Sequence, residues 1–267
     1  MRILLVCAFL MFSTFAHAET TSLYAAGSLK AALTEVVEAF ENSKAGNVPV
    51  ETTFGPSGLL RERIEKGEAA HVFASADTNH PRRLADQGRS TGEVRIFVRN
   101  RLCALVRPGF SVASERLLDM MLDPQVRLGI STPKADPSGD YAFALFAKAD
   151  KSRPGARAAL ESRALQLTGG PTSEKAPPDR NQYAWILEGG KADLFLTYCT
   201  NAILAKKELP TLRVVQLPAD LNVSADYGMI VLKDAPAVAS ELAQFVLGEQ
   251  GQAILTKYGF GRGDPVK

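Results

Sequence analysis

The chain has 267 residues, of which 46% are hydrophobic and 22% charged, and its formal net charge is +2. This composition predicts a folded chain, long enough for one large domain or two smaller lobes, and argues against intrinsic disorder. The near-neutral charge makes nucleic acid a poor candidate partner, because proteins that bind it carry a marked excess of basic residues.

Residues 1–18 have the pattern of a secretory signal. Arg2 supplies a positive charge, residues 3–15 are almost wholly apolar, and Ala-His-Ala at 16–18 offers small residues for cleavage. The apolar run is shorter than the ~20 residues that a membrane-spanning helix needs. We therefore expect residues 1–18 to be removed and the mature protein to be exported.

The cysteine content leaves two readings open. Cys7 would leave with the signal, so Cys103 and Cys199 remain. They could pair in an oxidising compartment, but two cysteines cannot form a disulfide-dependent scaffold, and no Cys/His spacing indicates a metal site. We favour two buried thiols over a disulfide, and we expect no metal cofactor.

Apolar runs alternate with helical patterns along the rest of the chain. Strands are predicted at 22–26, 48–54, 71–75, 96–98, 102–106, 128–131, 194–198, 214–217 and 227–232. Helices are predicted at 29–42, 58–66, 114–122, 141–149, 156–167, 183–188, 238–247 and 250–258. Such alternation predicts an α/β fold with crossover helices. Breaks near 102 and 221 suggest a first lobe of residues 19–101 and 222–267, and a second lobe of residues 102–221.

The least regular segment is residues 169–181, with the sequence GGPTSEKAPPDRN. Its three prolines and two glycines oppose regular structure. We predict a loop here, which can still help to shape a site.

Small polar residues stand between a strand and a helix at three places. These are Gly27-Ser28, Gly-Pro-Ser-Gly at 55–58 and Asp-Pro-Ser-Gly at 136–139. The first N–H groups of a helix lack an internal acceptor and the helix dipole is positive there, so converging helix starts can bind an oxyanion without a metal. Each serine alone could be an ordinary N-cap. Three such junctions, each with glycine, favour an anion site.

Several segments, taken in order, resemble the periplasmic molybdate-binding proteins of ABC importers. They are AAGSLKAALTEVVEAF, FGPSGLLRERIEKGEAAHVFASAD, STPKADPSGDYA, LEGGKADLFLTYCTNA and FVLGEQGQAILTKYGF, which together span nearly all of the chain after the signal. The resemblance implies a monomeric two-lobe periplasmic binding protein with mixed sheets and a hinge, and no enzymatic activity. It also implies capture of molybdate or tungstate, with no cofactor, and delivery to a membrane permease and ATPase.

The same resemblance implies particular ligand-binding residues. Ser28 and Ser57 would offer hydroxyl and backbone N–H groups to the anion. Ser138 would offer a backbone N–H, and Tyr198 its phenolic hydroxyl. Further candidates around these positions are Gly27, Gly58, Asp136, Gly139 and Tyr141.

Two positions stand out within this pattern. Arg180 occupies a place where the common molybdate proteins use an apolar residue. Asp136 resembles the Asp-Pro-x-Gly of the tungstate/molybdate branch, in which an acidic residue can meet the metal. One hypothesis is that Arg180 pairs with the anion or with Asp136, and the alternative is a solvent-facing loop arginine.

Two other functions stay open. The solute could be another inorganic anion, or a small organic one if Arg180 serves a carboxylate. A secreted serine hydrolase is the candidate from another class, but Leu59 breaks the Gly-x-Ser-x-Gly spacing around Ser57. His71 is expected to be packed and His80 to lie in a turn, so binding is favoured over catalysis.

Overall fold

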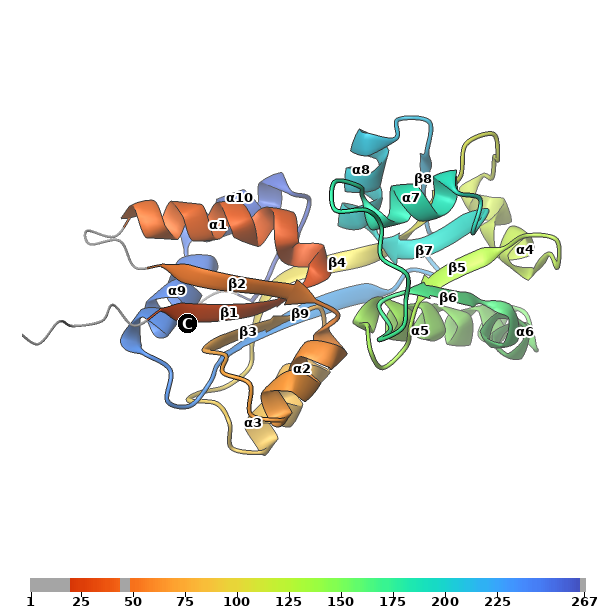
Figure 1. Cartoon of the computed structure of the whole chain (residues 1–267). Helices are drawn as coiled ribbons and strands as arrows, with labels where there is room; N and C mark the ends of the chain where they lie inside the picture. Colours follow the sequence, from red (N-terminus) through yellow and green to blue (C-terminus); the bar gives the residue numbers. More distant parts are fainter. Residues whose placement is uncertain (1–19, 44–48, 265–267) are drawn as a thin grey trace, which may run out of the picture.

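The computed structural model describes residues 20–43 and 49–264, and shows two α/β lobes side by side (Figure 1). The predicted signal at 1–18 lies outside the described residues. Within the described part, none of the helices combines the length and apolar character needed to cross a membrane. The predicted two-lobe α/β fold is confirmed.

The first lobe is built on parallel strands β1 (Thr21–Ala26), β2 (Val50–Gly55) and β3 (Val72–Ser75), with β9 (Ser224–Val231) antiparallel to β3. One face of this sheet carries α1 (Lys30–Ser43), α9 (Ala237–Leu247) and α10 (Glu249–Lys257); the other carries α2 (Ser57–Glu65) and α3 (Asn79–Asp86) (Figure 1). The short elements η1 (Gly27–Leu29) and β10 (Gly261–Arg262) complete it. A separate apolar cluster packs on each of these two faces of the sheet.

The second lobe has β5 (Leu128–Ser131) between β6 (Leu165–Thr168) and β7 (Leu194–Tyr198), all parallel. β8 (Arg213–Gln216) lies at the same end of β4 as β7. Its helices are η2 (Ser114–Arg116), α4 (Leu117–Leu122), α5 (Pro137–Ser152), α6 (Ala156–Arg163), α7 (Gln182–Glu188) and α8 (Cys199–Glu208). The sheets are mixed, as predicted.

One long strand, β4 (Arg95–Val106), runs through both lobes. Its residues 95–101 pair with β9, whereas residues 102–106 pair with β7 and β8. The chain returns to the first lobe between β8 and β9. The change of partners after Arg101 supports the predicted boundary at 101/102, although the boundaries themselves stay a prediction. The chain therefore crosses between the lobes twice, once in β4 and once between β8 and β9. Two such crossings allow the lobes to hinge.

Several predicted elements differ from the observed ones. The strands predicted at 96–98 and 102–106 are one strand, and the helix predicted at 156–167 ends at Arg163, before β6. Helices α3 and α8 were not predicted, and His80 lies in α3 rather than in a turn. Pro81 directly follows His80, but it falls in the first turn of α3, where a helix does not need the missing N–H.

Cys103 and Cys199 form a disulfide, with their Cα atoms 4.9 Å apart. The preference for two free thiols was wrong. The register of β4 on β7 sets Cys103 opposite Thr197, and Cys199 begins α8 directly after β7. The disulfide thus joins β4, the strand that runs through both lobes, to the residue that follows Tyr198.

Candidate functional site

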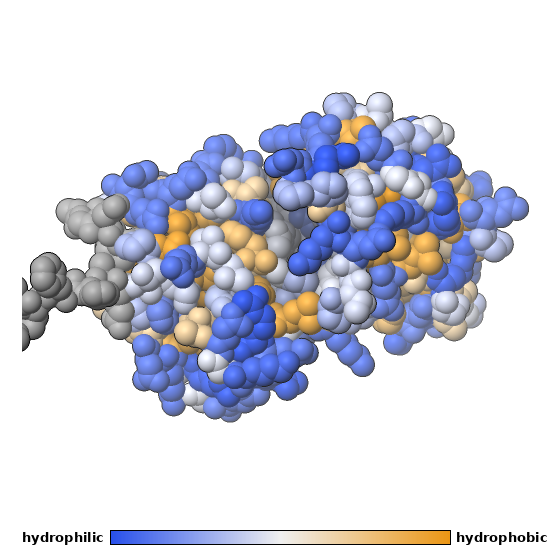
Figure 2. Space-filling view, viewed as in Figure 1, coloured by the Kyte–Doolittle hydropathy of each residue, from blue (hydrophilic) through white to orange (hydrophobic). Residues whose placement is uncertain are grey.

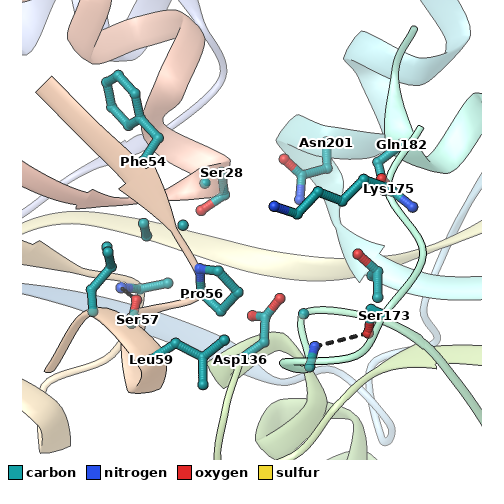
Figure 3. Close-up of a pocket in the computed structure, with 18 of the residues that line it drawn as sticks. Ser28, Phe54, Pro56, Ser57, Leu59, Asp136, Ser173, Lys175, Gln182 and Asn201 are labelled. Carbon is teal, nitrogen blue, oxygen red and sulfur yellow. Dashed lines mark hydrogen bonds between the residues drawn. The ribbon is translucent and has the colours of Figure 1, made fainter. Parts of the chain in front are cut away.

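A cavity of about 470 Å³ lies between the two lobes. The first lobe contributes the ends of β1, β2 and β3, and the second contributes the end of β7, the start of α7 and residues 168–175. Figure 2 shows the molecule hollowed between the lobes, and Figure 3 shows the side chains that face this space. Ser28, Ser57, Tyr198, Asp136 and Gly27 line it, as the sequence suggested.

Ser57 and Tyr198 meet at the main chain of Ala76. Ser57 Oγ accepts the N–H of Ala76 at 3.1 Å, and the Tyr198 hydroxyl donates to its carbonyl oxygen at 3.4 Å. Both side chains are 1% exposed. Because Ser57 already accepts from Ala76, its own O–H remains to be donated into the cavity.

A chain of hydrogen bonds orients Ser28. Asn100 Oδ1 accepts the N–H of Arg101, so its Nδ2 is the group that donates to the Tyr227 hydroxyl at 3.3 Å. Tyr227 lies 3.0 Å from Ser28 Oγ, and burial holds the Tyr227 pKa well above its usual value. Tyr227 therefore stays protonated, and either hydroxyl can be the donor in its bond with Ser28. With Tyr227 as the donor, the Ser28 O–H is left for a guest.

Neither of these serines is a helix cap. The N-cap of α2 is Pro56, with no side-chain cap bond, and Ser57 is the first helical residue. The N-cap of η1 is Ala26, again without a side-chain bond. The plain capping alternative for Ser28 and Ser57 is thus wrong.

The third junction differs from the prediction for Ser138. Asp136 caps α5, and its Oδ1 accepts the Ser138 N–H at 3.0 Å. The predicted backbone donor is therefore already used. Ser138 is not among the residues that line the cavity, and its buried hydroxyl has no hydrogen-bond partner.

Asp136 itself faces the cavity (Figure 3). Burial is the main cause that raises the pKa of its carboxyl to about 6, and the bond from the Ser138 N–H opposes the shift. An acidic group in an anion site changes charge near neutral pH, so binding there depends on pH.

Arg180 is placed away from this cavity. Its Nε donates to Glu208 at 2.7 Å, and a terminal nitrogen donates to Glu188. The hypothesised pair with Asp136 is replaced by these two pairs on α7 and α8, and Arg180 does not line the cavity.

The remaining candidates lie behind the cavity wall. Gly58 donates its N–H to Ala135 O at 2.9 Å, which joins the two lobes directly. Gly139 packs so closely that an added Cβ would lie 2.4 Å from Ser131 O. The Tyr141 ring meets the Tyr198 ring edge-on, with centroids 6.2 Å apart.

Several lining residues were missed by the sequence analysis, among them Ala76, Lys175, Gln182 and Asn201. Lys175 belongs to the predicted loop at 169–181, but no spacing or motif singled it out. Asn201 follows Tyr198 within the quoted segment LFLTYCTNA. It lies on the first turn of α8, and this helix was not predicted.

The geometry around Ser57 differs from that of a serine hydrolase. Its hydroxyl is bonded to Ala76 N, whereas His71 Nδ1 accepts the N–H of Ser22 and His80 lies in α3. The described residues also contain no group of three or more His, Cys, Asp or Glu side chains that could hold a metal ion.

Two hinged α/β lobes around a cavity lined with hydroxyl donors define a solute-binding protein. The chain belongs to the family described as bacterial extracellular solute-binding protein, whose model matches residues 21–261. This confirms the class that the quoted segments predicted.

Particular relatives are consistent with this assignment. The chain is 38% identical over 207 residues to the uncharacterised protein PM1146 of Pasteurella multocida, covering 77% of this chain and 84% of that one. It is 27% identical over 249 residues to the molybdate-binding protein ModA of Mycobacterium bovis, covering 92% and 85%. Its fold matches the periplasmic molybdate-binding protein of Azotobacter vinelandii with a TM-score of 0.69 at 19% identity, covering 90% of this chain and 98% of that one.

Proposed function

We propose that this protein captures a tetrahedral oxyanion, molybdate or tungstate, in the periplasm and delivers it to the permease and ATPase of an ABC importer. The observation that carries the proposal is the convergence of Ser28, Ser57 and Tyr198 on one cavity. The name of the Mycobacterium bovis relative supports molybdate as the first solute to test.

The donor set suits a fully deprotonated anion. Ser28 and Ser57 each have an O–H left to donate. Burial keeps the Tyr198 hydroxyl protonated by holding its pKa well above its usual value, and this O–H would turn from Ala76 O to the bound anion. Molybdate and tungstate carry no proton near neutral pH, so each oxygen can accept. Phosphate is partly protonated near neutral pH, so its own O–H would face an O–H of the site with no acceptor between them.

Closure of the lobes would link capture to delivery. Ser28 and Ser57 come from the first lobe and Tyr198 from the second, so an anion that contacts all three binds the closed form better. A permease that favours the closed form would then select the loaded protein.

Calorimetric titration with molybdate, tungstate, sulfate, phosphate and small carboxylates tests the proposal. We expect molybdate and tungstate to bind most tightly. We expect Ser57→Ala to weaken them by about tenfold to a hundredfold, the cost of a lost hydrogen bond to a charged group. The matched control is Ser162→Ala, since Ser162 bonds only within α6, to Ala159 O. Unchanged affinity in Ser57→Ala would contradict the assignment.

The pH dependence of binding follows from Asp136. Its carboxyl has a pKa raised to about 6 by burial, so it is mostly neutral below that pH and repels an anion above it. We expect molybdate affinity to fall about tenfold between pH 5.5 and 7.5. In Asp136→Asn, titrations over the same range should give a nearly flat profile. An affinity that rises with pH would show instead that the carboxylate favours the bound anion.

A further inference from the structure

The loop at 169–181, called the strap below, forms one side of the cavity and is held at several points. Ser173 Oγ accepts the Gly170 N–H at 2.9 Å. Gln182 bonds both to Ala176 N, at 2.8 Å, and to Glu174 O, at 3.0 Å. The main chain on each side of Lys175 is therefore fixed by one side chain, and Lys175 has a defined place over the cavity.

The ammonium group of Lys175 is unpaired. Lys175 lines the cavity, and no hydrogen bond or ion pair joins it to any residue in the described part of the chain. Figure 3 shows its side chain extended from the strap across the cavity. Arg63, the other cation in the lining, is bound to Glu68 at 2.6 Å. Lys175 is thus the lining cation that is available to a solute.

The cavity is larger than one oxyanion requires. Its volume of about 470 Å³ lies in the range of pockets for organic ligands of many atoms. An oxyanion of five heavy atoms takes the space of only a few waters, each about 30 Å³ in the liquid. With the lobes placed as in this structure, an anion at Ser28 and Ser57 would leave most of the cavity open, and this remaining space is bordered by Lys175 and by the apolar Phe54, Leu59 and Pro171.

We propose that the cavity has two subsites and takes a small organic solute with two acidic groups. The first, a tetrahedral acidic head group, binds where the oxyanion is proposed to bind, at Ser28, Ser57 and Tyr198. The second, a carboxylate, pairs with Lys175, and a short carbon body joins the two across the apolar wall. The inference rests on the proposed anion site and adds the strap as the element that selects the rest of the solute.

Two probes that differ in one charge test this directly. Both 3-sulfopropanoate and propane-1-sulfonate have a fully ionised sulfonate head and three carbons, but only the first has a carboxylate. In titration calorimetry of the whole mature protein, we expect 3-sulfopropanoate to bind about tenfold more tightly. Lys175→Met should remove this difference and leave the affinity for propane-1-sulfonate within about twofold. Lys207→Met, on the exposed end of α8, should change neither.

Failure of the inference can be told from failure of the proposed function. If molybdate binds with Ser57-dependent affinity but the two sulfonates bind equally or not at all, the second subsite is wrong and the oxyanion site stands. The same holds if Lys175→Met keeps the full difference between the probes. If neither molybdate nor either sulfonate binds, both proposals are wrong.

Discussion

Replacing Gly58 with alanine is expected to weaken anion binding by about a hundredfold. An added Cβ would lie 2.2 Å from Lys134 O and 2.8 Å from Ala135 O, both backbone atoms that cannot turn aside. The Gly58 N–H also donates to Ala135 O at 2.9 Å, so this glycine is one of the places where the two lobes touch. The methyl group would push the lobes apart and separate Tyr198 from the two serines.

The first lobe should stay folded in this variant, because alanine is a better helix former than glycine. Gly92→Ala is the matched control, since nothing lies within 4 Å of its added Cβ. Molybdate calorimetry measures the affinity, and small-angle X-ray scattering with and without molybdate measures closure. Wild-type affinity together with wild-type closure in Gly58→Ala would show that the lobe contact is not needed.

Removing the disulfide is expected to lower the free energy of unfolding by about 3–4 kcal/mol. Cys103 and Cys199 are 96 residues apart, and a cross-link that closes a long loop restricts the unfolded chain strongly. The bond also fixes the start of α8 next to Tyr198, so we expect molybdate affinity to fall as well.

Urea unfolding of the oxidised protein, the reduced protein and the double variant Cys103→Ala/Cys199→Ala gives the measurement. The reduced protein and the variant should have similarly lowered midpoints. An equal midpoint for the oxidised and reduced forms would mean that the bond contributes no stability. The pair forms because β4 and β7 are neighbours, and the cysteine spacing alone could not reveal that neighbour relation.

Local patterns predicted most of the fold. The strands at 128–131 and 194–198 were predicted with the observed limits, because continuous apolar runs between polar residues mark buried strands. Residues 165–167 of the strand at 165–168 were assigned to a helix, since so short a run cannot separate the two periods. Helix α8 was missed because its first residues, Cys199 to Asn201, are all buried and give no amphipathic pattern.

The candidate site was predicted in part. Glycine and serine at strand ends pointed to Ser28 and Ser57, and the family resemblance added Tyr198, which would otherwise pass as a core residue. Lys175 and Tyr227 could not be found, because their roles depend on which loop and strand fold against the cavity. Arg180 shows the same limit, since its partners Glu188 and Glu208 come together only through the packing of α7 on α8.

The central claim is that an anion binds among Ser28, Ser57 and Tyr198. The most direct measurement is a crystal structure of the protein with tungstate, using the anomalous scattering of tungsten to locate the ion. The account predicts one strong peak within hydrogen-bonding reach of all three hydroxyl groups, between the two lobes. A strong peak elsewhere, or an empty cavity in crystals grown with excess tungstate, would contradict it.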